Sequence, residues 1–322
     1  MRAFLVRRVA FALVLVACAS STAFLLTRAA PGDLATLLGP LAKAGEVAAL
    51  RERFGLDQPI IVQWAHWASR AVRLDLGESF LYNRPVISVL GPAALNTAIL
   101  AIVALTLATA SGIFLGVVSG SGGRTVARTV IRLLSALCVS LPPLLTSLIF
   151  VFIAARTGIV PAGGMSSASA GDLSWAAWLA DVAWHIPLPA LALALPIAAT
   201  FERLQSQALT EVVDQPFVTA ARARGVPGPA LIWRHAWPAS LRPICAVLGV
   251  AIGVLLSGSF VVEYVTTWPG LGRLMYEALR ARDIYLVAGC AAAGSALLAC
   301  GTLAGDLLLA AVDPRVREET GA

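Results

Sequence analysis

The chain has 322 residues, of which 58% are apolar and 13% are charged, about half the charged share of a typical soluble domain. Its mean hydropathy is +0.82, so the apolar side chains are too numerous for one globular core and must meet a second apolar solvent. The net charge is +6, and Lys43 is the only lysine. These values exclude an ordinary water-soluble enzyme and predict an all-α integral membrane protein.

Six uncharged runs are long enough to cross a bilayer as helices, which takes about 20 residues. They cover residues 9–27, 86–123 (best span 94–119), 133–155, 182–201, 244–262 and 284–305. We expect an N-terminal transmembrane helix (1–28), an outer loop (29–92), a core of five transmembrane helices (93–313) and a tail (314–322). The first run resembles a secretion signal, but it continues to Leu26 and can span, so we expect it to be retained.

Arginines near the span ends set the expected orientation, because basic residues flanking short loops are retained in the cytoplasm. Those on one side of a six-span chain are Arg2, Arg7, Arg8, Arg124, Arg128, Arg132, Arg203, Arg222, Arg224, Arg234, Arg242, Arg315 and Arg317. The opposite loops have a more balanced charge. Both termini are therefore expected in the cytoplasm.

Two stretches of the outer loop repeat apolar residues at helical spacing. The first contains Val47, Leu50 and Phe54, and the second contains Ile61, Trp64, Ala68 and Ala71. They predict two short amphipathic helices that lie on the membrane or cap the bundle.

The long loop after the fourth run (202–242) contains a short predicted helix. Pro216 stands at its start and Gly225 just past its end, which is the usual asymmetry of helix ends. A helix of this length is not stable alone in water. Phe217, Ala220 and Ala221 share one face, and two interpretations remain open. The helix rests in a groove of a partner protein, or it packs under its own bundle.

Small residues and prolines indicate how the spans pack. Glycines recur at every fourth position, a common sign of close helix packing, at Gly112, Gly116, Gly120, Gly249 and Gly253. Prolines predict bends or interruptions in the third and fourth runs at Pro142, Pro143, Pro187, Pro189 and Pro196.

Patterns for catalysis and for metal binding are missing from the sequence. Lys43 is followed by Ala44, so there is no Walker A loop and the chain is not a P-loop ATPase by itself. The three histidines lie in separate segments, and the five cysteines lie in apolar runs without a Cys-x-x-Cys pair. Asp306 lies in the last run, where we favour a polar contact with a neighbouring helix over a proton relay. We expect no catalytic residue, metal or cofactor.

Six groups of motifs follow one another from about Arg7 to Arg317. They are RAAPGD (28–33), LRERFGLDQPI (50–60) with LDLGES (74–79), SLPP (140–143), HIPLPALALALP (185–196), TAARARG (219–225) with WRHAWPASLRP (233–243), and SGSFVVEYVTTWPGLGRL (257–274) with the final DPRVR (313–317). In this order they resemble the inner-membrane permease subunit of binding-protein-dependent ABC importers. The branch is the one that handles dipeptides, oligopeptides and, in some members, nickel or glutathione.

The resemblance implies a non-catalytic transport subunit of the bacterial inner membrane. It identifies the TAARARG motif as the loop whose short helix docks into a groove on a nucleotide-binding subunit. The residues implied for this coupling are Phe217, Thr219, Ala220, Ala221, Arg222, Ala223, Arg224 and Gly225. Family motifs imply structural roles for Asp75, Gly77, Pro142, Glu263, Pro269, Gly270, Gly272, Arg273, Asp283, Asp306, Asp313 and Pro314. The chain departs from the family at Thr219, where many members have Glu or Arg, and at Pro238 and Arg242.

The implied partners are a second permease subunit that forms a heterodimer with this chain, two cytoplasmic ATP-binding subunits and a periplasmic substrate-binding protein. The lipid bilayer surrounds them, and no nucleic acid is expected. The expected cargo is a peptide or a related small solute, and the residues that bind it are not indicated. A nickel or glutathione permease of the same branch remains an alternative. So do a self-sufficient secondary carrier or channel, and a membrane enzyme.

Overall fold

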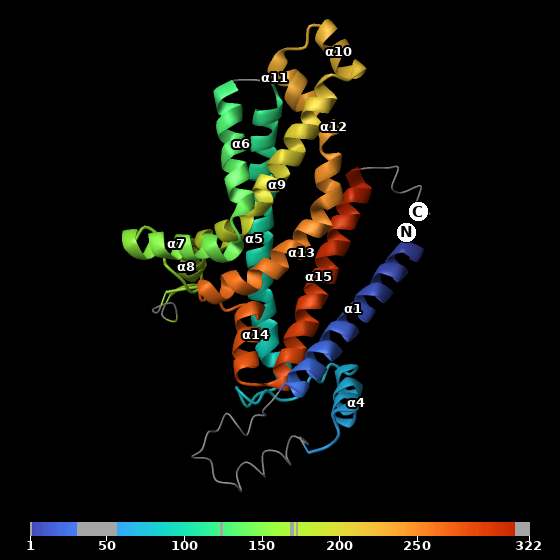
Figure 1. Cartoon of the computed structure of the whole chain (residues 1–322), viewed down its shortest axis with the longest axis vertical. Coiled ribbons are helices and arrows are strands. Elements are labelled where there is room, and N and C mark those ends of the chain that lie inside the picture. The colour runs from blue at the N-terminus through green and yellow to red at the C-terminus, as the bar shows by residue number, and fades with distance from the viewer. Residues whose placement is uncertain (1, 31–56, 123–124, 168–170, 172, 313–322) are drawn as a thin grey trace. The chain divides into compact units, whose positions relative to one another are not determined.

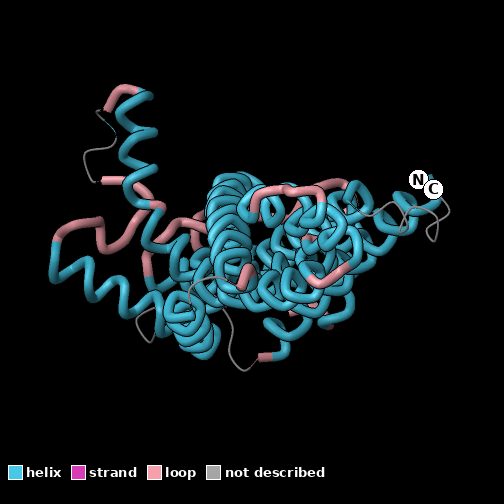
Figure 2. The backbone as a smooth tube through the Cα atoms, turned by 90° about the horizontal axis from the view of Figure 1, so that it is seen from above, coloured by secondary structure: helices cyan, strands magenta, loops and turns pink. Residues whose placement is uncertain are grey.

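A computed structural model of the chain describes residues 2–30, 57–122, 125–167, 171 and 173–312 (Figure 1). Helices make up most of the described backbone (Figure 2), and the strand-type pairing within it is an isolated bridge between Glu78 and Pro85. The helices are α1 (Arg2–Ala29), α4 (Ile60–Ala71), α5 (Val86–Gly120), α6 (Thr125–Ser140), α7 (Pro143–Thr157), α8 (Trp175–His185), α9 (Pro187–Val213), α10 (Pro216–Ala223), α11 (Gly228–Ala230), the π-helix η2 (Leu231–Ala236), α12 (Trp237–Ser240), α13 (Arg242–Val265), α14 (Leu271–Arg280) and α15 (Ile284–Val312).

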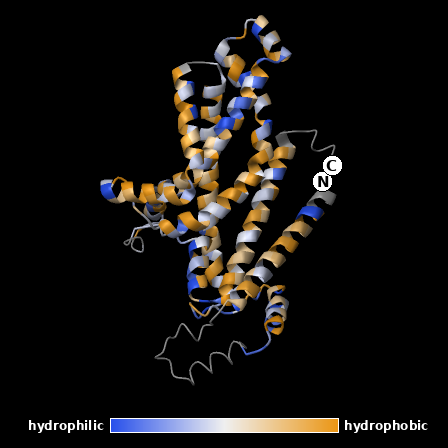
Figure 3. Ribbon diagram, viewed as in Figure 1, coloured by the Kyte–Doolittle hydropathy of each residue, from blue (hydrophilic) through white to orange (hydrophobic). Residues whose placement is uncertain are grey.

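Five of these helices are long and apolar enough to cross a membrane, namely α1, α5, α9, α13 and α15. Figure 3 shows how apolar residues dominate along α5, α13 and α15. Only 11% of the most apolar window of α1 and 22% of that of α5 are buried inside the protein. The remaining apolar surface therefore requires lipid or another membrane protein around it.

The third apolar run forms two helices rather than one straight span. α6 and α7 meet at an angle of 106°, and they count as a sixth span only if the bent pair is taken together. Pro142 and Pro143 stand at the break, where they lack the N–H groups that would continue the α6 ladder. The bend predicted from this proline pair is thus confirmed.

The fourth apolar run differs most from its expected bounds of 182–201. α8 ends at His185, and α9 begins at Pro187 and continues to Val213. Pro196 lies inside α9 without interrupting it. Glu202, which we expected at the start of a cytoplasmic loop, therefore lies within a long helix.

The chain divides into two compact units. One contains residues 1–4, 99–268 and 300–322, and the other contains residues 5–98 and 269–299. In the first unit α9 is central, since it contacts α6, α7, α8, α12 and α13. Its core is built largely of alanine and leucine, with Phe201 and Trp268 as fully buried aromatic residues.

The second unit has two smaller clusters. In one, Val86 and Leu90 pack with residues of α14 and α15. In the other, Trp67 of α4 stacks on Phe24 of α1 with ring centroids 5.2 Å apart. The amphipathic helix predicted after Pro59 is thus present as α4, although Ile61 is 64% exposed and Trp67 is its most buried apolar residue. The first amphipathic helix predicted in this loop lies outside the described residues.

Candidate functional site

α10 begins and ends where the sequence predicts. Pro216 occupies its first position, and Gly225 follows its end with a φ of +82°. The Gly225 N–H donates to the Arg222 carbonyl at 3.0 Å, and the Val226 N–H donates to the Ala221 carbonyl at 3.3 Å. These two bonds form a Schellman motif, and the positive φ explains why glycine stands at this position.

One face of α10 packs against its own protein. Val218 and Ala221 are 0% and 1% exposed, and they belong to a cluster with Leu209 of α9 and Leu231 of η2. The sequence pattern predicts Ala221 on one face with Phe217 and Ala220, and this prediction is wrong, because Ala221 is buried while the other two are exposed. Val218 and Ala221, three positions apart, together form the inner face.

The other face of α10 is exposed. Phe217 keeps 44% of its surface open, and Thr219, Ala220, Ala223 and Arg224 are exposed as well. Phe217, Ala220 and Arg224 follow the spacing i, i+3 and i+7, which places them along one side of the helix.

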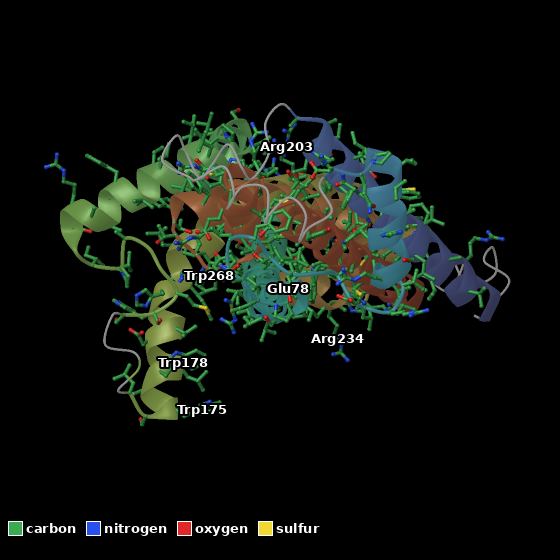
Figure 4. All side chains as sticks on the ribbon, turned by 90° about the horizontal axis from the view of Figure 1, so that it is seen from below. Glu78, Trp175, Trp178, Arg203, Arg234 and Trp268 are labelled. Atoms are coloured by element: carbon green, nitrogen blue, oxygen red, sulfur yellow. The ribbon has the colours of Figure 1, made fainter. Side chains whose placement is uncertain are left out.

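A cavity of about 580 Å³ lies beside α10 within the same unit. Its walls include Val117 of α5, Leu231 and Trp233 of η2, and Arg222, which is the charged residue of its described lining. The Arg222 side chain thus lines this cavity. η2 also carries the exposed Arg234, labelled in Figure 4.

α5 and α9 approach each other at a stripe of glycines. A Cβ atom on Gly112 would lie 2.6 Å from the Phe201 Cβ, and one on Gly116 would lie 2.5 Å from the Gln205 Cβ. Only glycine therefore fits at these two positions. The close packing that the glycine spacing predicted is confirmed for this pair of helices.

The same contact contains Glu202, a functional candidate that our sequence reasoning missed. Glu202 is 1% exposed, whereas the adjacent Arg203, labelled in Figure 4, is exposed. The Ser119 hydroxyl donates to Glu202 Oε1 at 2.5 Å. The helical spacing of Glu202 with Gln205 and Ser206, both buried, was the available signal.

In the second unit, Asp75 and Gly77 shape the LDLGES motif. The Arg70 guanidinium donates to Asp75 Oδ2 at 2.9 Å, which lowers the pKa of the Asp75 carboxyl and raises that of Arg70. The Gly77 N–H also donates to this carboxylate, at 3.0 Å. Gly77 has a φ of +91°, and a Cβ atom there would lie 3.2 Å from the Tyr285 ring.

Asp283 holds this loop to the start of α15. Its side chain is fully buried and accepts from the Ser79 hydroxyl at 2.6 Å, the Leu81 N–H at 3.1 Å and the Leu286 N–H at 3.0 Å. Burial raises the pKa of the Asp283 carboxyl, although these hydrogen bonds oppose the shift.

Residues of the WPGLGR motif surround the start of α14. Gly270 precedes the helix, and the Asn96 amide donates to the Pro269 carbonyl at 2.9 Å. Arg273 forms an ion pair with Glu277 at 2.9 Å. Glu277 also accepts from the Tyr82 hydroxyl at 2.7 Å, and burial together with this carboxylate raises the pKa of Tyr82 to about 12.

The remaining family-motif residues are dispersed. Gly272 is buried in α14, Glu263 is fully buried in α13, and Asp306 is half-buried in α15. Asp313 and Pro314 lie outside the described residues. His185 Nδ1 lies 2.7 Å from the Asp181 carbonyl. No group of three potential metal ligands occurs in the described part of the chain.

Comparison with known proteins assigns the family. Residues 112–318 match the family model described as "Binding-protein-dependent transport system inner membrane component", and residues 1–91 match the model for the N-terminal part of such membrane components. The chain is 32% identical over 319 residues to a putative peptide transport system permease protein of Brucella abortus, covering 98% of this chain and 99% of that protein.

Two further relatives are 29% identical over 319 residues, which is 98% of this chain in each case. One is the probable peptide ABC transporter permease protein y4tP of Sinorhizobium fredii, matched over its whole length. The other is the oligopeptide transport system permease protein AppB of Bacillus subtilis, matched over 99% of its length. The chain therefore belongs to the family of multi-pass inner-membrane components of binding-protein-dependent transport systems.

Proposed function

We propose that this chain is the transmembrane permease subunit of an ATP-driven importer and that α10 couples it to separate ATPase subunits. The observation that carries the proposal is the two-sided character of α10. Val218 and Ala221 fix the helix to its own protein, while Phe217 and Ala220 are left exposed next to Arg224. A short helix held from behind with an apolar residue exposed in front suits docking into a groove on a partner.

The proposed importer has four kinds of component. A second permease, different from this chain, completes the pathway, two cytoplasmic subunits hydrolyse ATP, and a periplasmic binding protein delivers the solute. The names of the relatives support peptides or related small solutes as the cargo. The chain itself contributes no catalytic residue.

The proposed orientation places α10 and both termini in the cytoplasm. Its support is the excess of arginine in the loops on that side, with Arg128, Arg222 and Arg224 among the described residues. ATP-driven closure of the ATPases then pushes on α10, and the bundle alternates between inward-open and outward-open states.

Co-purification tests this function first. The tagged chain is extracted from its host in mild detergent, and the proteins that remain bound are identified by mass spectrometry. We expect a P-loop ATPase and a second permease. If the chain emerges alone and moves solute in liposomes without ATP, it is a secondary carrier.

Variants of α10 then test the docking face. Ala220→Glu places a charge on the exposed face, and we expect it to release the ATPase. Ala239→Glu is the matched control, since Ala239 is an exposed alanine of α12 in the same segment. Gly225→Val should leave the chain inserted but abolish coupled transport, because valine is strained at a φ of +82°. Normal uptake with Gly225→Val would contradict the coupling role.

A further inference from the structure

A cluster of buried polar side chains lies where α9 contacts α5 and α12. On α9, Glu202, Gln205 and Ser206 follow the spacing i, i+3 and i+4, and they are 1%, 0% and 3% exposed. Ser119 of α5 and Ser240 of α12 are 0% and 1% exposed. We refer to these five residues as the polar brace.

Two hydrogen bonds tie α9 to its neighbours through the brace. The Ser119 hydroxyl donates to Glu202 Oε1 at 2.5 Å, and Gln205 Nε2 donates to the Ser240 hydroxyl oxygen at 2.6 Å. The Ser240 hydroxyl in turn donates to the Trp237 carbonyl at 2.8 Å. Because the Ser240 hydroxyl proton is donated to Trp237, its oxygen can only accept from Gln205, and the Gln205 side chain must therefore point its amide nitrogen at that oxygen.

The helices touch at the brace. A Cβ atom on Gly116 would lie 2.8 Å from the Glu202 carbonyl oxygen, and one on Gly120 would lie 2.8 Å from the Ser206 carbonyl oxygen. Backbones at this distance leave no layer of water or lipid between α5 and α9, so movement of one helix displaces the other.

The position of the brace along the chain relates it to α10. The Gln205–Ser240 bond joins residues 35 positions apart, and α10 lies between them. This bond joins the two ends of the segment that contains α10. The Glu202–Ser119 bond joins the α9 end of this segment to α5.

We propose that Glu202 and Gln205 are positioning residues that transmit movement of α10 to α5 and α9. This inference rests on the proposed function, because it assumes that an ATPase moves α10. The ATPase touches α10, and the brace makes the segment behind it move as one body with the bundle.

Unpaired oxygens in the brace indicate that stability alone does not account for these polar residues. Glu202 Oε2, Gln205 Oε1 and Ser206 Oγ are buried without a hydrogen-bond partner in the described structure. Such atoms cost free energy, and an apolar side chain of similar size would fill the space at a lower cost. The retention of these polar residues therefore needs a role other than stability, and holding α9 against α5 and α12 during movement supplies one.

The test uses the reconstituted assembly with its ATPases and its binding protein. Glu202→Leu removes the bond to Ser119 and keeps the volume, whereas Glu202→Gln keeps an acceptor for Ser119. Glu211→Leu is the matched control on an exposed position of α9. The readouts are ATP hydrolysis with and without the binding protein, the thermal midpoint, and the amount of ATPase retained.

We expect Glu202→Leu to keep the wild-type midpoint and the bound ATPase but to lower the stimulation by the binding protein about fivefold or more. Glu202→Gln and Glu211→Leu should keep it. Ser240→Ala cuts the second bond and should lower the stimulation in the same direction if Glu202→Leu fails to assemble. Wild-type stimulation in Glu202→Leu, or in Ser240→Ala, overturns the proposal.

A distance measurement separates transmission from simple damage. Spin labels on Ala223 of α10 and Ile102 of α5, both exposed, report whether the two helices move together when ATP is added. Their separation should stay constant in the wild type and in Glu202→Gln and change in Glu202→Leu. An ATP-induced change in the wild type contradicts the brace. Absence of bound ATPase in the wild type instead refutes the proposed function.

Discussion

Two buried carboxyl groups, Asp283 and Glu202, occupy contrasting environments. Asp283 accepts hydrogen bonds on both oxygens, from a hydroxyl and from backbone N–H groups. Glu202 accepts one bond, and its Oε2 has no partner in the described structure. The first carboxyl suits a fixed anchor for the loop before α5, and the second suits a residue that ties α9 to α5 for a role other than stability. Completeness of pairing thus separates a structural group from a candidate for transmitting movement.

The largest expected effect tests this contrast directly. Asp283→Leu leaves the donors of Ser79, Leu81 and Leu286 buried without an acceptor, and it should destabilise the fold by about 3 kcal/mol or more. Glu202→Leu removes one hydrogen bond together with the unpaired Oε2, so the two effects should offset and the thermal midpoint should stay near the wild-type value. Thermal unfolding of the purified assembly compares the two. Equal losses would remove the distinction.

The glycine contact behind Glu202 gives the next effect. Gly116→Ala adds a Cβ atom 2.5 Å from the Gln205 Cβ, and the forced separation of α5 and α9 should cost about 1–3 kcal/mol. Gly91→Ala is the control on the same helix, because a Cβ atom there meets nothing within 4 Å. It should be neutral or slightly stabilising. Thermal unfolding measures both variants. Wild-type stability in Gly116→Ala would show that α5 and α9 can separate without cost.

An exposed ion pair on the loop that Asp283 anchors should contribute less. Arg70 and Asp75 are 2.9 Å apart, but their side chains are 52% and 55% exposed, so solvent screens the attraction. Asp75→Asn should therefore cost about 0.5 kcal/mol or less. Raising the salt concentration should reduce the difference from the wild type. A loss as large as that of Asp283→Leu would show that exposure does not weaken this pair.

The smallest expected effect is on how stability changes with pH, where Asp75 and Asp283 should act in opposite directions. The pKa of Asp75 is lowered, so its contribution to stability is present above its ordinary value of 3.8 and is lost as the pH falls through the folded-state value. The pKa of Asp283 is raised, so the folded state holds a proton that the unfolded chain releases, and stability falls as the pH rises from 3.8 through the raised value. Melting curves of Asp75→Asn and Asp283→Asn against pH should differ from the wild type with opposite slopes. Slopes of one sign would contradict the assignment.

Much of the helical framework could be predicted because it depends on local chemistry. Apolar runs located the long helices, Pro142 and Pro143 marked the break, and Pro216 and Gly225 delimited α10. The inner face of α10 was not predicted correctly. Val218 and Ala221 are buried because Leu209 and Leu231 lie behind them, and these belong to the separate helices α9 and η2.

The length of α9 was underestimated for a related reason. Glu202 and Arg203 are adjacent charged residues, which in a sequence indicate the end of a membrane span. In the structure they lie on different sides of one helix, and Ser119 of α5 donates to one oxygen of Glu202. The partner of a buried polar residue is a tertiary fact, so its burial could not be predicted from neighbouring residues.

The break between α6 and α7 bears on how the chain is made. The insertion machinery reads hydrophobicity along about 19 residues, and residues 133–155 present it with one uninterrupted apolar segment. The 106° bend releases backbone groups that lipid cannot satisfy. α7 contacts α9 and α13, which are synthesised later. Pro142 and Pro143 break the helix locally, but α7 gains its packing partners only after the ribosome has delivered α9 and α13, so a chain truncated before α9 should be cleaved by protease in this segment more readily than the full chain.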